Sequence, residues 1–428
     1  MRISLALRCL IVGLALLAIA LHPLSNFANT GASLTTLLLQ GFGSDALAAA
    51  PTTPPAAHGI YVWPDNWAVK NGDFDKALAV SGVDGVGVHV TWSEISPALK
   101  TYDFTLMDRQ LSAARSHHLA VELAVAAGEG TPEWLFAPPP LGMGLRRLDF
   151  AMTYHGGKEP CHAVSMPPPW APGYQAAFAD MLAQLSRHLR ATGYDREVAA
   201  IKLTGMNTLT EELALPNESP VESGNPNPCV TDSPRIWAEA GYRPSLIVRA
   251  MKGIAASYQR YFPNTAVTLP VIVLFAFPPI GEDGRPMPRL KATEINNKLL
   301  DDLVRTAAQA LHGHLVVQDC FLIDDEPADQ RTVSLARANS IPVAWQTNVW
   351  FGKYGKGAAC SRGGNGFVQK MQNAIPCNES SYLRMLHNGM FPKGGAGPSE
   401  NGLFIEVFPW DVMAFSRAIM VAHDEWKR

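Results

Sequence analysis

The chain has 428 residues and a formal net charge of −3, with 47% hydrophobic and 17% charged residues. This share of apolar side chains is ample for a sizeable core and excludes a globally disordered chain. The charge is nearly neutral and no long Lys/Arg run occurs, so nothing in the sequence indicates a nucleic acid or an anionic membrane as a partner. The length allows one large domain or two ordinary ones.

The first segment, 1–50, has the pattern of an export signal. Arg2 and Arg8 precede an apolar run from Cys9 to Leu21, an order that is typical of a secretory signal. The run is shorter than the ~20 residues of a membrane span. We therefore expect export to the periplasm or the extracellular space, with a folded domain at 58–428. An uncleaved membrane anchor at the N-terminus is the alternative interpretation.

Eight short apolar segments follow in chain order, with amphipathic segments between most of them. The expected strands are Gly59–Trp63, Gly82–Trp92, Leu119–Gly128, Val198–Gly205, Ala266–Phe277, His314–Phe321, Ile341–Asn348 and Gly402–Phe408. The expected helices between them lie within 102–118, 173–193, 294–313 and 329–340. Buried strands that alternate with helices predict an α/β fold with a parallel sheet.

Eight such units predict a (β/α)8 TIM barrel with long loops at the C-terminal face of the strands. A doubly wound open sheet is the alternative fold. It is disfavoured because no Gly-rich phosphate loop follows the first strand, where Trp63–Trp67 stands instead.

The cysteines are expected to form disulfides in an oxidising compartment. With Cys9 in the predicted signal, Cys161–Cys229 and Cys360–Cys377 are plausible pairs that leave one free thiol. The alternative is that all are reduced. The chain has no CxxC or HExxH motif, so the sequence supports neither a metal site nor a cofactor.

Carboxylates, amides and tryptophans gather at the predicted strand ends, where the active sites of TIM barrels lie. The candidate substrate-binding residues are Trp63, His89, Trp92, Glu94, Glu129, Asn207, Glu211, Gln346, Asn348 and Trp410. Tryptophans stack on the apolar faces of sugar rings, and carboxylates and amides bind hydroxyls. These residue types therefore favour a carbohydrate substrate, while the oligomeric state has no signal in the sequence.

One segment of the chain resembles a known family. Val90–Leu135 has Trp92 and Glu94 after the second strand, Asp108 in the following helix and "PEWL" at its end. It resembles the second and third barrel units of clan A glycoside hydrolases, in particular family 42 β-galactosidases and the β-amylase barrel. The resemblance implies a glycosidase that cleaves O-glycosidic bonds of a β-galactoside-like or other glycan.

A second segment bears on the acid of that reaction. Clan A enzymes place an Asn-Glu pair after the fourth strand, but here Asn207 is not followed by a glutamate. The later "EELALP" resembles the β-amylase segment in which the acid glutamate precedes Leu, two residues and Pro. The resemblance implies Glu212 as the acid, with Glu211 as the alternative.

The second carboxylate departs from the clan pattern. The clan nucleophile ends the seventh strand, where Gln346 stands, so Glu406 in the eighth strand is the expected base or nucleophile. A purely structural carboxylate is the alternative. Because the fourth and eighth strands face each other across a barrel, we expect a carboxyl separation above ~5.5 Å and inversion. A catalytically inactive carbohydrate-binding barrel of the cell envelope is the competing function, and a structural envelope protein is a third.

Overall fold

The computed structural model describes residues 56–64, 72–153, 161–220, 229–271, 276–287, 289–322, 330–347, 378–391 and 402–427. The predicted export signal, Asn348 and the expected Cys360–Cys377 bridge lie outside these residues. Within the described ranges, no helix has both the length and the apolar character that crossing a membrane requires.

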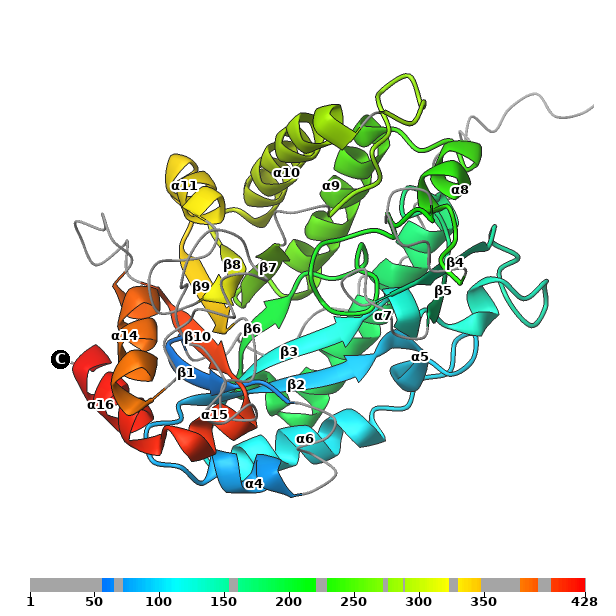
Figure 1. The fold of residues 1–428 in the computed structure, drawn as a ribbon. Helices are drawn as coiled ribbons and strands as arrows, with labels where there is room; N and C mark the ends of the chain where they lie inside the picture. Colours follow the sequence, from blue (N-terminus) through cyan, green and yellow to red (C-terminus); the bar gives the residue numbers. More distant parts are fainter. Residues whose placement is uncertain are drawn as a thin grey trace, which may run out of the picture. The chain divides into compact units, whose positions relative to one another are not determined.

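Eight parallel strands close into a barrel, as the sequence predicts (Figure 1). They are β1 (Gly59–Val62), β2 (Gly85–Thr91), β3 (Ala120–Ala126), β6 (Val198–Lys202), β7 (Ala266–Val271), β8 (Leu315–Leu322), β9 (Val343–Thr347) and β10 (Phe404–Val407). β1 pairs with both β2 and β10, with Tyr61 opposite Gly85 and Glu406. This closure excludes the doubly wound open sheet.

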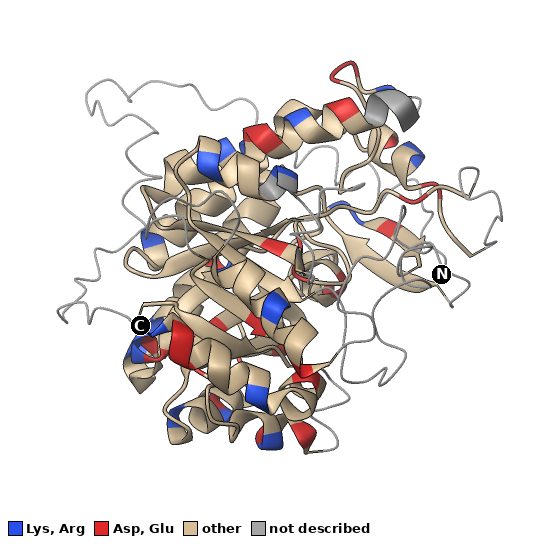
Figure 2. Ribbon diagram, turned by 60° about the vertical axis from the view of Figure 1, so that its left-hand side comes forward, with Lys and Arg blue, Asp and Glu red and all other residues tan. Residues whose placement is uncertain are grey.

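The helices form the outer layer around the strands, and both signs of charge are interspersed along them (Figures 1 and 2). The longer ones are α6 (Thr105–Ser116), α7 (Pro172–Thr192), α9 (Pro244–Tyr261), α10 (Arg289–Leu311), α11 (Gln330–Ala338), α14 (Glu379–Met390) and α16 (Ser416–Trp426). The four helices expected from periodicity are confirmed as α6, α7, α10 and α11. Short helices α4 (Asp73–Leu78), α5 (Trp92–Ile95), α8 (Ser233–Glu239) and α15 (Pro409–Ala414) fill the connections.

Two glycines of β2 make room for aromatic rings inside the barrel. A Cβ on Gly85 would lie 2.3 Å from the ring of Tyr61, and one on Gly87 would lie 2.2 Å from the ring of Trp63. Tyr61 packs with Phe404 and small residues into an apolar cluster. Closer to the C-terminal ends of the strands, the inward-facing residues are polar, and the candidate site lies at this end of the barrel.

An antiparallel hairpin that the sequence analysis did not predict follows β3. Its strands are β4 (Leu148–Met152) and β5 (His162–Met166), which pair only with each other. A disulfide between Cys161 and Cys229 joins the start of β5 to the segment before α8, with 5.8 Å between the Cα atoms. The expected Cys161–Cys229 pair is thus confirmed, and Cys320 is a buried free thiol.

Removal of this disulfide is expected to lower the stability of the domain. The bridge closes a loop with a sequence separation of 68 residues. Loop-closure entropy for that length predicts that Cys161→Ser reduces the free energy of unfolding by about 4 kcal/mol. Denaturant unfolding of Cys161→Ser and of the Cys161→Ser/Cys229→Ser double variant checks this, because both should lose the same amount. A loss below about 1 kcal/mol would contradict the prediction.

Candidate active site

The segment after β6 is fixed by two buried tyrosines of the helix layer. The Tyr174 hydroxyl of α7 donates a hydrogen bond to the Gly205 carbonyl at 2.7 Å. The backbone N–H of Thr204 donates to the Tyr258 hydroxyl of α9 at 3.1 Å. Gly205 has φ +101°, a conformation that L side chains rarely adopt, so the chain turns here at a glycine. The polar residues that follow the strand therefore belong to an ordered turn.

Asn207 shapes the loop that carries the two adjacent glutamates. Its side-chain oxygen accepts a hydrogen bond from the Gly205 N–H at 3.2 Å, and its amide donates to the Thr210 carbonyl at 2.8 Å. The chain then rejoins the sheet, since the Leu213 N–H donates to the Pro270 carbonyl of β7. Both ends of the acid loop, defined as residues 204–212, are thus anchored. Asn207 is a positioning residue for this loop.

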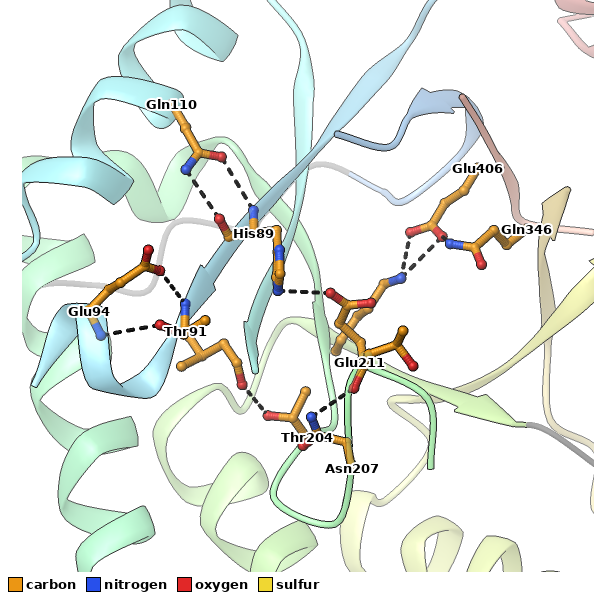
Figure 3. A network of polar contacts seen from close by, with 12 residues as sticks. His89, Thr91, Glu94, Gln110, Thr204, Asn207, Glu211, Gln346 and Glu406 are labelled. Atoms are coloured by element: carbon orange, nitrogen blue, oxygen red, sulfur yellow. Dashed lines mark hydrogen bonds and ion pairs between the residues drawn. The ribbon is translucent and has the colours of Figure 1, made fainter. Parts of the chain in front are cut away.

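Glu211 forms an ion pair with His89 of β2, with 2.8 Å between Oε1 and Nε2, and the two side chains are 10% and 29% exposed (Figure 3). Burial alone would raise the pKa of Glu211, but His89 and then Lys202 lower it to about 2. For His89, burial lowers the pKa, yet Glu211 outweighs burial and the net shift is upward. The side chain of Gln110 of α6 accepts a hydrogen bond from the His89 N–H and donates one to the His89 carbonyl. Glu211 is therefore a fixed negative charge.

Glu212 has the opposite character to its neighbour. Burial and then the negative charge of Glu211 raise its pKa to about 7. Its Oε2 atom is buried and makes no hydrogen bond with the described residues. A carboxyl that keeps its proton near neutral pH and faces no protein acceptor is suited to donate that proton to a substrate.

Lys202 connects opposite strands through the interior of the barrel. Its Nζ lies 2.9 Å from Oε1 and 3.1 Å from Oε2 of Glu406, and β6 and β10 are opposite strands. Gln346 of β9 donates a hydrogen bond to Oε2 of Glu406 at 2.7 Å (Figure 3). The Lys202 and Glu406 side chains are 1% and 0% exposed, so water does not screen this pair.

Two further residues complete the polar cluster inside the barrel. Glu122 of β3 accepts a hydrogen bond from the Thr268 hydroxyl of β7. Its burial and then the negative charge of Glu406 raise the pKa of Glu122 well above the ordinary value. Lys202 also lies over the ring of Trp63, 3.5 Å from its centroid. Burial lowers the pKa of Lys202, but Glu406 and then Glu122 outweigh burial and raise this pKa above its ordinary value. Lys202 therefore stays charged.

The other candidate substrate-binding residues have different positions. Trp92 is fully buried in the core, edge-on to Trp134 and Phe178, which is a packing position rather than a sugar-stacking one. Glu94 closes a capping box, because its carboxylate accepts the Thr91 N–H at 2.7 Å. Glu129 is exposed after β3, while Trp410 is half-buried in α15.

Two central residues, Lys202 and Glu122, are not among those predicted from the sequence. Each is the only charged side chain within an otherwise apolar strand, β6 and β3 respectively. That pattern is a usable signal, because a lone charge in a buried strand requires a partner inside the fold. Asp, Glu, His and Cys residues of the described ranges form no group of three or more that could hold a metal ion.

Comparisons with known proteins support the fold. No protein-family model matches the chain, and no curated protein matches its sequence. The catalytic domain of β-amylase from Paenibacillus polymyxa superposes with a TM-score of 0.50 at 12% identity, covering 86% of this chain and 99% of that domain. An intracellular xylanase from Thermoanaerobacterium saccharolyticum gives 0.44 at 10% identity, over 86% and 92%. At 12% identity, the similarity to the β-amylase domain shows only that this chain has the same barrel fold.

Proposed function

We propose that the chain is a glycoside hydrolase in which Glu212 is the general acid. The observation that carries the proposal is the position of Glu212 in the loop that follows the fourth barrel strand, half-buried and directly beside Glu211, which is held as a negative charge by its ion pair with His89. Glycoside hydrolysis needs one carboxyl that keeps its proton and one that is ionised. The fold that this chain shares with a β-amylase catalytic domain agrees with that chemistry.

Glu212 protonates the oxygen of the departing sugar in this proposal. Its raised pKa keeps a large fraction of the carboxyl protonated up to about pH 7. Glu211 sustains that state through its negative charge, and His89 holds Glu211 in place. Trp63 and His89, whose rings lie 6.2 Å apart, are proposed to contact the sugar bound above them.

Glu406 is the second carboxylate of the proposal, as base or nucleophile. Its negative charge contributes to the raised pKa of Glu212, so the two groups act within one electrostatic environment. Lys202 and Gln346 orient its carboxylate. Because the acid loop runs from β6 to β7 and neither strand neighbours β10 in the barrel, hydrolysis is proposed to invert the anomeric configuration. The substrate is proposed to be a β-galactoside-like or other glycan.

A glycan hydrolysis screen with NMR detection of the first-formed anomer tests this function. We expect release of a reducing sugar from at least one glycan, with inverted configuration at the anomeric carbon. A retained configuration would overturn inversion but keep the glycosidase. If no glycan in the screen is hydrolysed, the enzyme proposal fails.

Glu211→Gln is expected to move the alkaline limb of the pH–activity profile to lower pH. Removal of the negative charge beside Glu212 lowers the pKa of the acid, so its proton is lost at lower pH. The pH dependence of kcat/KM measures the shift. Glu197→Gln is a matched control, because Glu197 pairs with Arg115 on the outer surface and should leave the limb in place. An unmoved limb in Glu211→Gln would show that Glu211 does not tune the acid.

An inactive carbohydrate-binding barrel is the second candidate function. The observation in its favour is that Gln346 occupies the strand end where clan A enzymes have a nucleophile and that Glu406 is fully buried. Sugar binding without hydrolysis in the same screen would favour this function. For either function we propose export, and the Cys161–Cys229 disulfide supports an oxidising compartment.

A further inference from the structure

A pocket beside the acid loop is not used by the proposed chemistry. It has a volume of about 410 Å³ and is lined by residues that follow β2 and β3 and by the hairpin strand β5. This volume falls in the ~300–1,000 Å³ range of small-molecule sites. Glu129, Glu133 and Ala163 in its lining are exposed, so the pocket opens to solvent.

The pocket is joined directly to the acid loop. The Glu129 N–H donates a hydrogen bond to the Thr208 carbonyl of that loop at 2.7 Å. Gly128 permits this approach, because a Cβ there would lie 2.0 Å from the same carbonyl oxygen. A ligand held in the pocket is therefore placed at the edge of the barrel mouth, next to the segment that carries Glu212.

The side chains of the pocket have the chemistry of a sugar site. Ser93, Thr131 and Ser165 contribute hydroxyl groups to the lining. The Ser93 hydroxyl pairs with that of Thr91, and the Ser165 hydroxyl donates to Asp149 and can still accept, whereas the Thr131 hydroxyl is buried with no hydrogen-bond partner among the described residues. The ring of Phe136 lines the same pocket and is held by Arg147, whose guanidinium lies 4.3 Å from the ring centroid. An aromatic ring beside several hydroxyls matches the apolar face and polar edge of a pyranose.

The charges of the pocket restrict the kind of sugar. The Glu129 carboxylate forms no ion pair with the described residues, whereas Glu133 is paired with Arg147. A free carboxylate in the lining repels a uronic acid or a sulfated sugar and accepts hydrogen bonds from the hydroxyls of a neutral one.

We propose that this pocket is a subsite for a neutral pyranose unit of the substrate, separate from the unit whose bond Glu212 protonates. The inference rests on the proposed glycosidase function and extends it, because it makes the substrate an oligosaccharide rather than a simple glycoside. The hairpin β4–β5, tied down by the Cys161–Cys229 disulfide, forms one wall of the subsite.

Phe136→Ala and Ser165→Ala test the subsite by comparing a long and a short substrate. Phe136→Ala is expected to raise KM for a neutral tetrasaccharide of galactose, glucose or xylose by about 10-fold, the usual order for truncation of an aromatic anchor. Ser165→Ala should raise it by a smaller factor. Neither should change kcat/KM for an aryl monoglycoside, which does not reach the pocket. Leu141→Ala is the control, because Leu141 is 76% exposed and lies outside the lining.

Binding measured by NMR titration separates failure of the subsite from failure of the function. If wild type binds the neutral tetrasaccharide and Phe136→Ala weakens binding, the subsite holds even where no hydrolysis is found. If hydrolysis occurs and the two variants leave both substrates unchanged, the subsite is overturned while the glycosidase stands. Equal binding of oligogalacturonate and the neutral tetrasaccharide would overturn the assignment to neutral sugars.

Discussion

Glu212→Gln is expected to lower kcat for a glycoside with an alkyl or sugar leaving group by about 10²–10⁴-fold, the usual contribution of a general acid. Glutamine preserves the shape of the side chain and has no acidic proton to give. The half-buried position of Glu212 and its pKa of about 7 make this the residue whose proton the reaction can use near neutral pH. Steady-state kinetics at several pH values measure the loss, and the alkaline limb should disappear with the carboxyl.

The leaving group supplies the control for this prediction. An aryl glycoside with a strongly acidic phenol leaves without protonation, so Glu212→Gln should lose far less activity on it than on an alkyl glycoside. Glu239→Gln, at an exposed carboxylate of α8, should behave as wild type on both substrates. An equal loss on both glycosides would show that Glu212 does not act as the acid.

Lys202→Met is expected to lower the free energy of unfolding by about 3–5 kcal/mol, the cost of leaving a buried charge without its partner. The lysine neutralises Glu406 inside the barrel, where both side chains are essentially unexposed. Glu406→Gln should cost less, because Glu122 also interacts with Lys202 and is able to lose its proton and replace the missing charge. Denaturant unfolding of the two variants measures the difference.

The surface pair Lys298–Asp302 provides the matched control, since Lys298 is 76% exposed and Lys298→Met should change stability very little. The Lys202→Met/Glu406→Gln double variant should recover part of the loss. Equal costs for the two single variants would show that Glu122 does not replace Glu406. Activity measured on Glu406→Gln separates the two roles of this carboxylate. If Glu406 is a base or nucleophile, Glu406→Gln should lose as much activity as Glu212→Gln. If Glu406 is only a counter-ion of Lys202, the variant should lose stability alone.

The fold is largely readable from the sequence because its signals are local. Each barrel strand is a short apolar run, and helices such as α6 and α7 have an amphipathic period. Right-handed crossovers then leave few arrangements for eight such units. The hairpin β4–β5 escaped prediction because its strands are not continuous apolar runs: buried residues alternate with exposed or half-buried ones, and the two strands pair only with each other.

The candidate site is only partly readable in this way. The sequence places Glu211, Glu212 and Glu406 at strand ends, and it shows that Gln346 cannot be a carboxylate. It does not show which glutamate keeps its proton, because that depends on burial and on groups distant in the chain. His89 lies 122 positions before Glu211 in the sequence, yet its imidazole sets the charge of that glutamate. Trp92 is the opposite case. It stands at a predicted strand end, yet its ring is buried against Phe178 of α7 in the hydrophobic core.

What the sequence determined by itself is the barrel and the set of polar groups at its mouth, because alternation of apolar and amphipathic segments is a property of neighbouring residues. Only the tertiary structure decided how those groups divide their charges. Closure of the barrel brings Lys202 across to Glu406 and His89 beside Glu211, and at these short distances in a water-poor interior each charge fixes the protonation of the next. Beside the charged Glu211, Glu212 has its pKa raised to about 7 by burial and by that charge.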